Sequence, residues 1–219
     1  MWGFSLLVLL FRGVNCTTLD AVTYGSALKL FSLSEQSSSE KFYLFSLNVQ
    51  WSTNSGQVVT ACKDRASTDS YWQVQSNDIS SSTGSPIQCG SVVSFRHLNT
   101  GTLLSSNEGK SNLSGQHEVV ASKSSDDSVR FVVECVDKDD HWKRTKSIRL
   151  RHVTTGKYLR SASKYSYNQG NCPNCPIIGD REVSGGEANS REDQWAVDLG
   201  VFFKTTKEST EEDDLRDEL

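Results

Sequence analysis

The sequence predicts an all-β protein with a β-trefoil fold, in which three repeats of four strands surround a pseudo-threefold axis. Segments recur three times, roughly 55–65 residues apart, and the pair "SFRHLNTGTLLSS" (94–106) and "RLRHVTTGKYLRS" (149–161) shows this most clearly. The recurring segments are short and alternate in polarity, as strands do, and helical periodicity is absent. Each unit also closes on a bulky aromatic residue. These features together favour a closed threefold barrel over an open solenoid.

Four strand-like segments can be followed through all three units. The first strands are expected in 25–32, 90–97 and 145–152, and the second in 41–46, 101–106 and 156–161. The third are expected in 55–61, 114–121 and 179–185, and the fourth in 71–74, 130–133 and 194–197. Gly, Ser, Asn and Asp separate the segments, as expected of turns. The repeats therefore span about 20–78, 85–136 and 143–203, all within one domain, residues 17–203.

Alternation along these strands predicts which side chains fill the barrel. The inward set is Leu28, Leu30, Leu44, Tyr71 or Trp72, Val93, Phe95, Leu104, Phe131, Ile148, Leu150, Leu159 and Trp195. The aromatic residues at the start of the fourth strands, Trp72, Phe131 and Trp195, are the repeated closing positions. Ile148 and Leu150 alternate with Arg149 and Arg151, which predicts a strand with a charged outer face.

The repeated "RH" pairs are predicted to be structural. Arg96 and His97 in repeat two correspond to Arg151 and His152 in repeat three, while repeat one has Ser32 at the histidine position. Each histidine ends a first strand just before a turn, where its ring can bond turn carbonyls. The turn glycines, Gly101 and Gly156, are expected to adopt positive φ. Recurrence at equivalent positions favours a structural role, because an active site is usually built once.

The two ends of the chain predict residence in the endoplasmic-reticulum lumen. The apolar run Phe4–Phe11 suits the core of a signal peptide, residues 1–16, with cleavage after Cys16. Residues 204–219 hold seven acids against three bases and should form a flexible tail. The tail ends in Arg216, Asp217, Glu218 and Leu219, which match a DEL-type retrieval signal. No later segment is apolar enough to insert into a membrane.

Charge gives little support for nucleic acid as a partner. The chain carries −4 overall; the tail accounts for −4 and Arg12 in residues 1–16 for +1, which leaves −1 on residues 17–203. No broad basic field is present to recruit nucleic acid or anionic lipid. No Gly-x-Ser-x-Gly, HExxH or phosphate-cradling loop appears, so we expect no catalytic residues, no cofactor and no metal.

The repeats resemble a known module. The pattern "RHxxTGxxL…SGxxEV…W" is similar to MIR repeats, which are named for protein mannosyltransferases, inositol-trisphosphate receptors and ryanodine receptors. With the two targeting signals, the chain resembles the stromal-cell-derived-factor-2-like proteins over about residues 20–203. The resemblance implies a β-trefoil without known catalytic activity. It also implies a role beside a J-domain co-chaperone and the lumenal Hsp70-class chaperone, in contact with unfolded or mannosylated secretory polypeptides.

Two disulfides are expected after loss of Cys16. Cys89 opens repeat two and Cys135 closes it, so a trefoil places them at neighbouring strand ends. The resemblance implies that relatives have a similar bridge in repeat one as well, where this chain has Tyr24 and no cysteine. Cys172 and Cys175 lie in "NQGNCPNCPIIGD", which looks like an insertion in repeat three. A local disulfide is the favoured interpretation. A redox site, a zinc knuckle and a bridge to Cys62 are the alternatives.

Two function classes remain. The favoured one is a non-enzymatic adaptor or co-chaperone in protein folding and quality control. The alternative is a mannose-binding module linked to O-mannosylation, for which Trp51 and Trp142 are candidate sugar platforms outside the barrel positions. Asn112 in "NLS" is a candidate N-glycosylation site.

Overall fold

The computed structural model describes residues 20–34, 40–51, 56–78, 80–188 and 191–203 of the chain. The predicted signal peptide and the acidic tail with Arg216–Leu219 lie outside the described residues.

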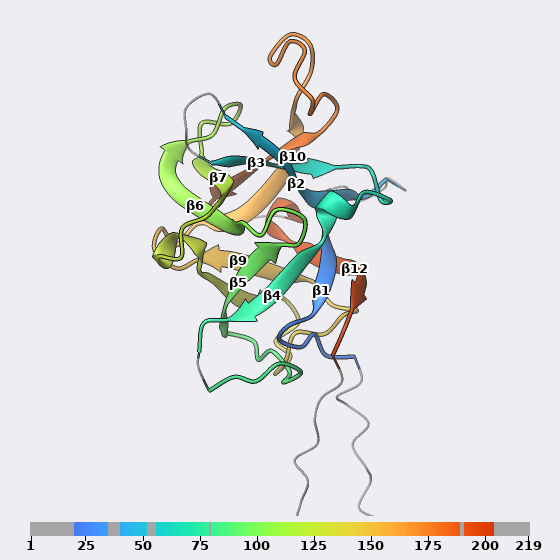
Figure 1. The fold of residues 1–219 in the computed structure, drawn as a ribbon, viewed down its shortest axis with the longest axis vertical. Helices are drawn as coiled ribbons and strands as arrows, with labels where there is room; N and C mark the ends of the chain where they lie inside the picture. Colours follow the sequence, from blue (N-terminus) through green and yellow to red (C-terminus); the bar gives the residue numbers. More distant parts are fainter. Residues whose placement is uncertain (1–19, 35–39, 52–55, 79, 189–190, 204–219) are drawn as a thin grey trace, which may run out of the picture.

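The described residues form twelve strands and three short 3-10 helices, so the all-β prediction is confirmed (Figure 1). Unit one contains β1 (Ala27–Ser32), β2 (Phe42–Gln50), β3 (Gln57–Cys62), η1 (Thr68–Ser70) and β4 (Trp72–Ser76). Unit two contains β5 (Val92–His97), β6 (Leu103–Lys110), β7 (His117–Ser122), η2 (Asp127–Val129) and β8 (Phe131–Cys135). Unit three contains β9 (Ile148–His152), β10 (Tyr158–Ser166), β11 (Arg181–Gly186), η3 (Arg191–Asp193) and β12 (Trp195–Val201).

Six strands form the barrel and three hairpins cap it, as in a β-trefoil. The first strand of each unit pairs with the fourth strand of the unit before it, in β4–β5, β8–β9 and β12–β1. Because β12 pairs with β1, the last strand closes the barrel against the first (Figure 1). The hairpins β2–β3, β6–β7 and β10–β11 join one another through β3–β7, β7–β11 and β11–β3. Closure of this kind removes exposed sheet edges.

Three backbone hydrogen bonds form a ring at the end of the barrel opposite the hairpins. The Val22 amide donates to the Trp142 carbonyl at 2.8 Å, Ile87 donates to Val22 at 3.0 Å, and Trp142 donates to Ile87 at 2.8 Å. All three side chains are fully buried. The prediction that Trp142 is an external sugar platform is therefore wrong: its ring packs edge-on against Phe95 in the core.

The predicted inward residues are all buried, and at the Tyr71/Trp72 position it is Trp72 that enters the core. The indole nitrogens of Trp72 and Trp195 donate to the carbonyls of Leu44 and Leu159, at 3.0 and 2.8 Å. In unit two Phe131 has no donor and packs edge-on against Phe95. The closing aromatic residues thus fasten the hairpins of units one and three to the barrel through buried hydrogen bonds.

Two disulfides are present. Cys89 is bonded to Cys135, and their Cα atoms are 5.6 Å apart across the two ends of unit two. Cys172 is bonded to Cys175 within the long β10–β11 connection, which projects beyond the hairpin cap (Figure 1). Cys62 is free, and burial raises the pKa of its thiol to about 11. A thiol with so high a pKa is a poor nucleophile at neutral pH.

Candidate functional site

The two repeated histidines join neighbouring units. In His97, Nδ1 lies 2.8 Å from Thr100 Oγ1 and Nε2 lies 2.9 Å from the Asp69 carbonyl oxygen of unit one. His152 repeats this arrangement, with Thr155 Oγ1 at 2.9 Å and the Ser128 carbonyl oxygen at 3.0 Å. Both rings are buried, and burial lowers the pKa of each imidazole. Both ring nitrogens of each histidine therefore have hydrogen-bond partners within the protein.

The other residues of the repeated motif complete the same turns. Gly101 and Gly156 have φ of +71° and +68°, a region that residues with a Cβ rarely enter. Arg96 is exposed, and its Nη1 donates to the Gly101 carbonyl at 3.2 Å. Arg151 instead donates from Nε to Glu134 Oε1 at 2.6 Å. The structure therefore gives this motif a local structural role, and none of its side chains lines an open site together with the cysteines or with Asn112.

The Asn112 turn is held by a carboxylate from another hairpin. Glu182 is 3% exposed, and its two oxygens accept from the backbone amides of Leu113 and Ser114 at 2.6 and 3.0 Å. The Ser111 and Ser114 hydroxyls are hydrogen-bonded at 2.8 Å. Asn112 itself is exposed at the tip of this turn. Its side chain is also hydrogen-bonded to the Tyr167 side chain.

A second apolar cluster lies where the β10–β11 connection packs against the β2–β3 hairpin. Val58, Tyr167 and Ile177 are buried there, and Trp51, Cys172 and Cys175 pack against them, as do Leu47 and Leu113. The rings of Trp51 and Tyr167 are 5.9 Å apart. Trp51 is thus half-buried in packing contacts. The Cys172–Cys175 loop covers this cluster.

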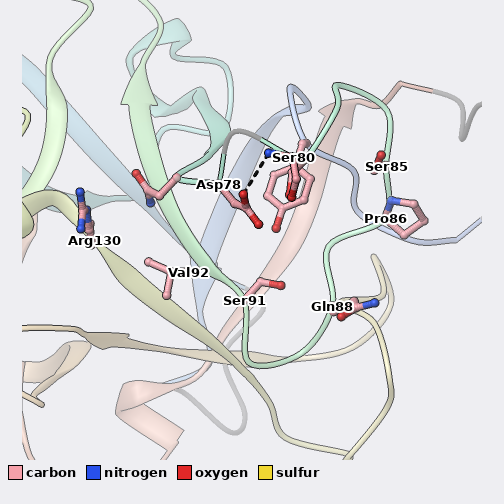
Figure 2. Close-up of a pocket in the computed structure, with 11 residues that line it drawn as sticks. Asp78, Ser80, Ser85, Pro86, Gln88, Ser91, Val92 and Arg130 are labelled. Atoms are coloured by element: carbon pink, nitrogen blue, oxygen red, sulfur yellow. Dashed lines mark hydrogen bonds between the residues drawn. The ribbon is translucent and has the colours of Figure 1, made fainter.

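A concavity lies beside the connection between units one and two. It has a volume of about 580 Å³, and Figure 2 shows its walls. Asp78, Ser80 and Ser81 form one wall, and Ser91, Val92 and Arg130 another; Tyr24, Asn77, Ser85, Pro86 and Gln88 complete the lining. Asp78 Oδ1 accepts from the Ser80 amide at 2.9 Å. Hydrogen bonds from Ser80 lower the pKa of the Asp78 carboxyl, so it is ionised at neutral pH.

Arg130 lies at the far side of this concavity, and its charge is already balanced. Its Nη1 is 2.8 Å from Asp127 Oδ1. Tyr24 is only 7% exposed, so its ring is not presented to a ligand. The concavity therefore offers an ionised carboxylate, amides and hydroxyls, without an exposed aromatic ring.

The described residues contain no group of three or more His, Cys, Asp or Glu side chains placed to hold a metal ion. Within the same residues, no helix has the length and apolar character needed to cross a bilayer.

Comparison with known proteins identifies the family. The MIR domain model matches residues 28–141, just over half of the chain. Stromal cell-derived factor 2-like protein 1 of Bos taurus is 31% identical over 211 residues, covering 93% of this chain and 89% of the relative. The chain belongs to the stromal cell-derived factor 2-like family. The resemblance seen in the "RHxxTG" repeats is thereby confirmed.

Solved structures agree with this assignment. The crystal structure of the SDF2-like protein from Arabidopsis thaliana matches with a TM-score of 0.76 and 26% identity, covering 85% of this chain and 99% of that one. The S. cerevisiae protein O-mannosyltransferase complex bound to the sugar donor matches with a TM-score of 0.66 and 19% identity, covering 87% of this chain and 27% of that one. The second likeness shows a shared fold. Members of the stromal cell-derived factor 2-like family and this mannosyltransferase thus contain the same β-trefoil.

Two features of this family member were missed from sequence. The concavity beside Asp78 depends on the shape of a long connection, and local residue patterns carry no signal for it. The Glu182 contact joins residues 68 or more positions apart. A carboxylate in a strand that, apart from Arg181, contains small and apolar residues, "REVSGG", was the available signal for a buried polar role.

Proposed function

We propose that this protein is a non-enzymatic adaptor of the endoplasmic-reticulum lumen that acts in protein folding and quality control. Family membership over 93% of the chain is the observation that carries the proposal. The occupied ring nitrogens of His97 and His152 are consistent with a role in binding rather than catalysis. The apolar run Phe4–Phe11 and the terminal Arg216–Leu219, both outside the described residues, support the location.

In this proposal the partners are a J-domain co-chaperone and the lumenal Hsp70-class chaperone, and the clients are unfolded or mannosylated secretory polypeptides. A small, closed barrel stapled by the Cys89–Cys135 disulfide provides a rigid platform for such contacts. Rigid surfaces lose little entropy on binding, which favours a scaffolding role.

Affinity purification from secretory cells tests this proposal. The tag is placed after residue 16, so that the terminal carboxylate of Leu219 stays free. Co-purification of a J-domain protein with the lumenal Hsp70-class chaperone is the expected result. Recovery of neither, under conditions that preserve other lumenal complexes, would overturn the proposal.

The alternative is a mannose-binding module. The fold shared with the O-mannosyltransferase favours it, although that likeness concerns the fold alone. The burial of Trp142 removes one of the two candidate sugar platforms, and Trp51 is partly covered by packing. Recovery of mannosylated glycoproteins that free mannose releases, without the chaperones, would support this alternative.

A further inference from the structure

The concavity beside Asp78 lies at the first of the three pseudo-equivalent junctions between units. At each junction the fourth strand of one unit pairs with the first strand of the next. Trp72 pairs with His97 in β4–β5, and Phe131 pairs with His152 in β8–β9. When these two registers are extended, Asp78 faces Ser91 at the first junction and Asp137 faces Lys146 at the second.

A repeated turn confirms that these positions are equivalent. The amide of Ser91 donates to the carbonyl of Gln88, three residues before it, at 3.1 Å. The amide of Lys146 makes the same bond to Lys143 at 3.2 Å, and Ser26 makes it to Thr23 at 3.1 Å. Ser26, Ser91 and Lys146 thus occupy one position of the repeat.

At the other two junctions, side chains of this chain occupy the corresponding positions. At the second junction, Lys146 Nζ lies 2.9 Å from Asp137 Oδ2. At the third, between β12 and β1, the corresponding place is taken by Phe202, whose ring packs under the Arg144 guanidinium at 3.7 Å. At the first junction Asp78 keeps the carboxylate, but Ser91 replaces the lysine, and no basic side chain among the described residues pairs with Asp78.

We propose that this concavity, the Asp78 pocket, binds a lysine side chain of a partner polypeptide. The ammonium group of the partner takes the place that Lys146 fills at the next junction, against Asp78. The inference rests on the proposed function, since it identifies the surface that an adaptor presents to a polypeptide partner. The volume of about 580 Å³ exceeds that of one lysine side chain, so residues that flank the lysine can enter with it.

Lysine fits the lining better than a sugar does. Sugar sites use an exposed aromatic face, and Tyr24, the ring in the lining, is buried. The hydroxyls of Ser80 and Ser91 and the Gln88 amide are suited to accept from the remaining ammonium protons (Figure 2). Arg130 presents no uncompensated positive charge, because Asp127 pairs with it.

The direct test is a titration of the ¹⁵N-labelled full chain with the peptide acetyl-Ser-Gly-Lys-Gly-Ser-amide, followed by NMR amide shifts. The expected result is saturable shifts confined to Asn77, Asp78, Gln88 and Ser91, and none with the same peptide carrying Gln in place of Lys. Asp78→Asn should weaken binding about fivefold, the factor that corresponds to loss of an exposed ion pair worth ~1 kcal/mol. Shifts from both peptides alike, or from neither, would overturn the proposal.

Ser91→Lys is the decisive variant, because it copies the Asp137–Lys146 pair into the first junction. It should fold with an unfolding midpoint at or above that of the wild type, and it should abolish the peptide shifts. Ser163→Lys adds the same charge on the exposed face of β10, outside the lining, and should bind like the wild type. Binding that survives in Ser91→Lys, or shifts at these residues caused by mannose instead of the lysine peptide, would contradict the site.

If Ser91→Lys fails to fold, the titrations of the wild type and of Asp78→Asn with the two peptides decide whether the lysine site exists. The titration is also independent of the chaperone purification. A lysine-specific response without co-purified chaperones would support the lysine site and overturn the adaptor role. Co-purified chaperones without a lysine-specific response would support the adaptor role and overturn the lysine site.

Discussion

The Nε2 atom of His97 lies 2.9 Å from the carbonyl oxygen of Asp69, so a side chain at the end of β5 is bonded to the backbone of the preceding unit. The same bond recurs between His152 and Ser128 at 3.0 Å. In both places the histidine ring also packs in a tilted arrangement against the closing aromatic residue, Trp72 or Phe131, with ring centroids 4.9 and 5.3 Å apart. These contacts predict that each histidine stabilises the packing of its unit against the preceding one.

Replacement of His97 by Ala should lower the free energy of unfolding by about 3 kcal/mol. The variant leaves the Asp69 carbonyl without its partner and opens a gap beside the buried Trp72 ring. Urea denaturation followed by tryptophan fluorescence measures the loss. The neighbouring exposed Arg96→Ala is the matched control and should cost about 0.5 kcal/mol or less. Equal effects of the two substitutions would contradict a structural role for the histidine.

Stability should fall as the pH drops below about 6.5, the ordinary value for histidine. Burial lowers the pKa of His97 and of His152 in the folded protein, so the unfolded chain binds more protons in this range. Their contribution is complete above the unfolded pKa and is lost as the pH falls through the folded one. Urea midpoints at pH 7.5 and 5.5 measure this, and the difference should shrink when both histidines are replaced by Gln. A midpoint that does not change between the two pH values would exclude the mechanism.

The two disulfides should contribute unequally to stability. Cys89 and Cys135 are 46 residues apart, whereas Cys172 and Cys175 are three residues apart. Loop-closure entropy then gives about 4 kcal/mol for the first and below ~2 kcal/mol for the second. Calorimetry of the paired Cys→Ser variants would show this ranking. A greater loss of stability on removing the Cys172–Cys175 bond would contradict this ranking. It would mean that the loop does more than cover the apolar cluster around Trp51.

Asn112 should carry an N-linked glycan when the chain is made in a secretory host. The residue is exposed in the turn that Glu182 holds, and it opens the Asn-Leu-Ser sequon. Glycosidase treatment should increase electrophoretic mobility. Asn112→Gln and Ser114→Ala should each remove the shift, and Ser111→Ala, outside the sequon, should keep it. Identical mobility before and after treatment would show that the sequon is unused.

Much of the fold could be predicted from sequence because the repeat constrains it three times over. Leu28, Val93 and Ile148 belong to different units, yet each is an inward residue of a first strand, and all three are fully buried. The same comparison marks Gly101 and Gly156 as turn residues. A residue type that recurs at the same position in more than one unit is required by the packing there. In a single strand, the same residue type could be present by chance.

Features that occur in one unit only could not be predicted by comparing the repeats. Trp142 stands among polar residues in "HWKRTKS", and its equivalence to Val22 and Ile87 becomes visible only through the ring of hydrogen bonds that joins them. Lys29 reads as an outward residue of β1, but it is 1% exposed, and its ammonium donates to the carbonyls of Arg65 and Ser67, both at 2.6 Å. The Asp78 pocket arises because the segment from Asp78 to Ser91 is four residues longer than its counterpart from Asp137 to Lys146.

The adaptor role itself is tested most directly by a client-aggregation assay with purified components. Light scattering of a reduced, unfolded secretory protein is followed with the J-domain protein alone and with its complex with this chain. The adaptor proposal predicts that the complex suppresses aggregation at concentrations where the J-domain protein alone does not. Equal suppression by the complex and by the J-domain protein alone would contradict it.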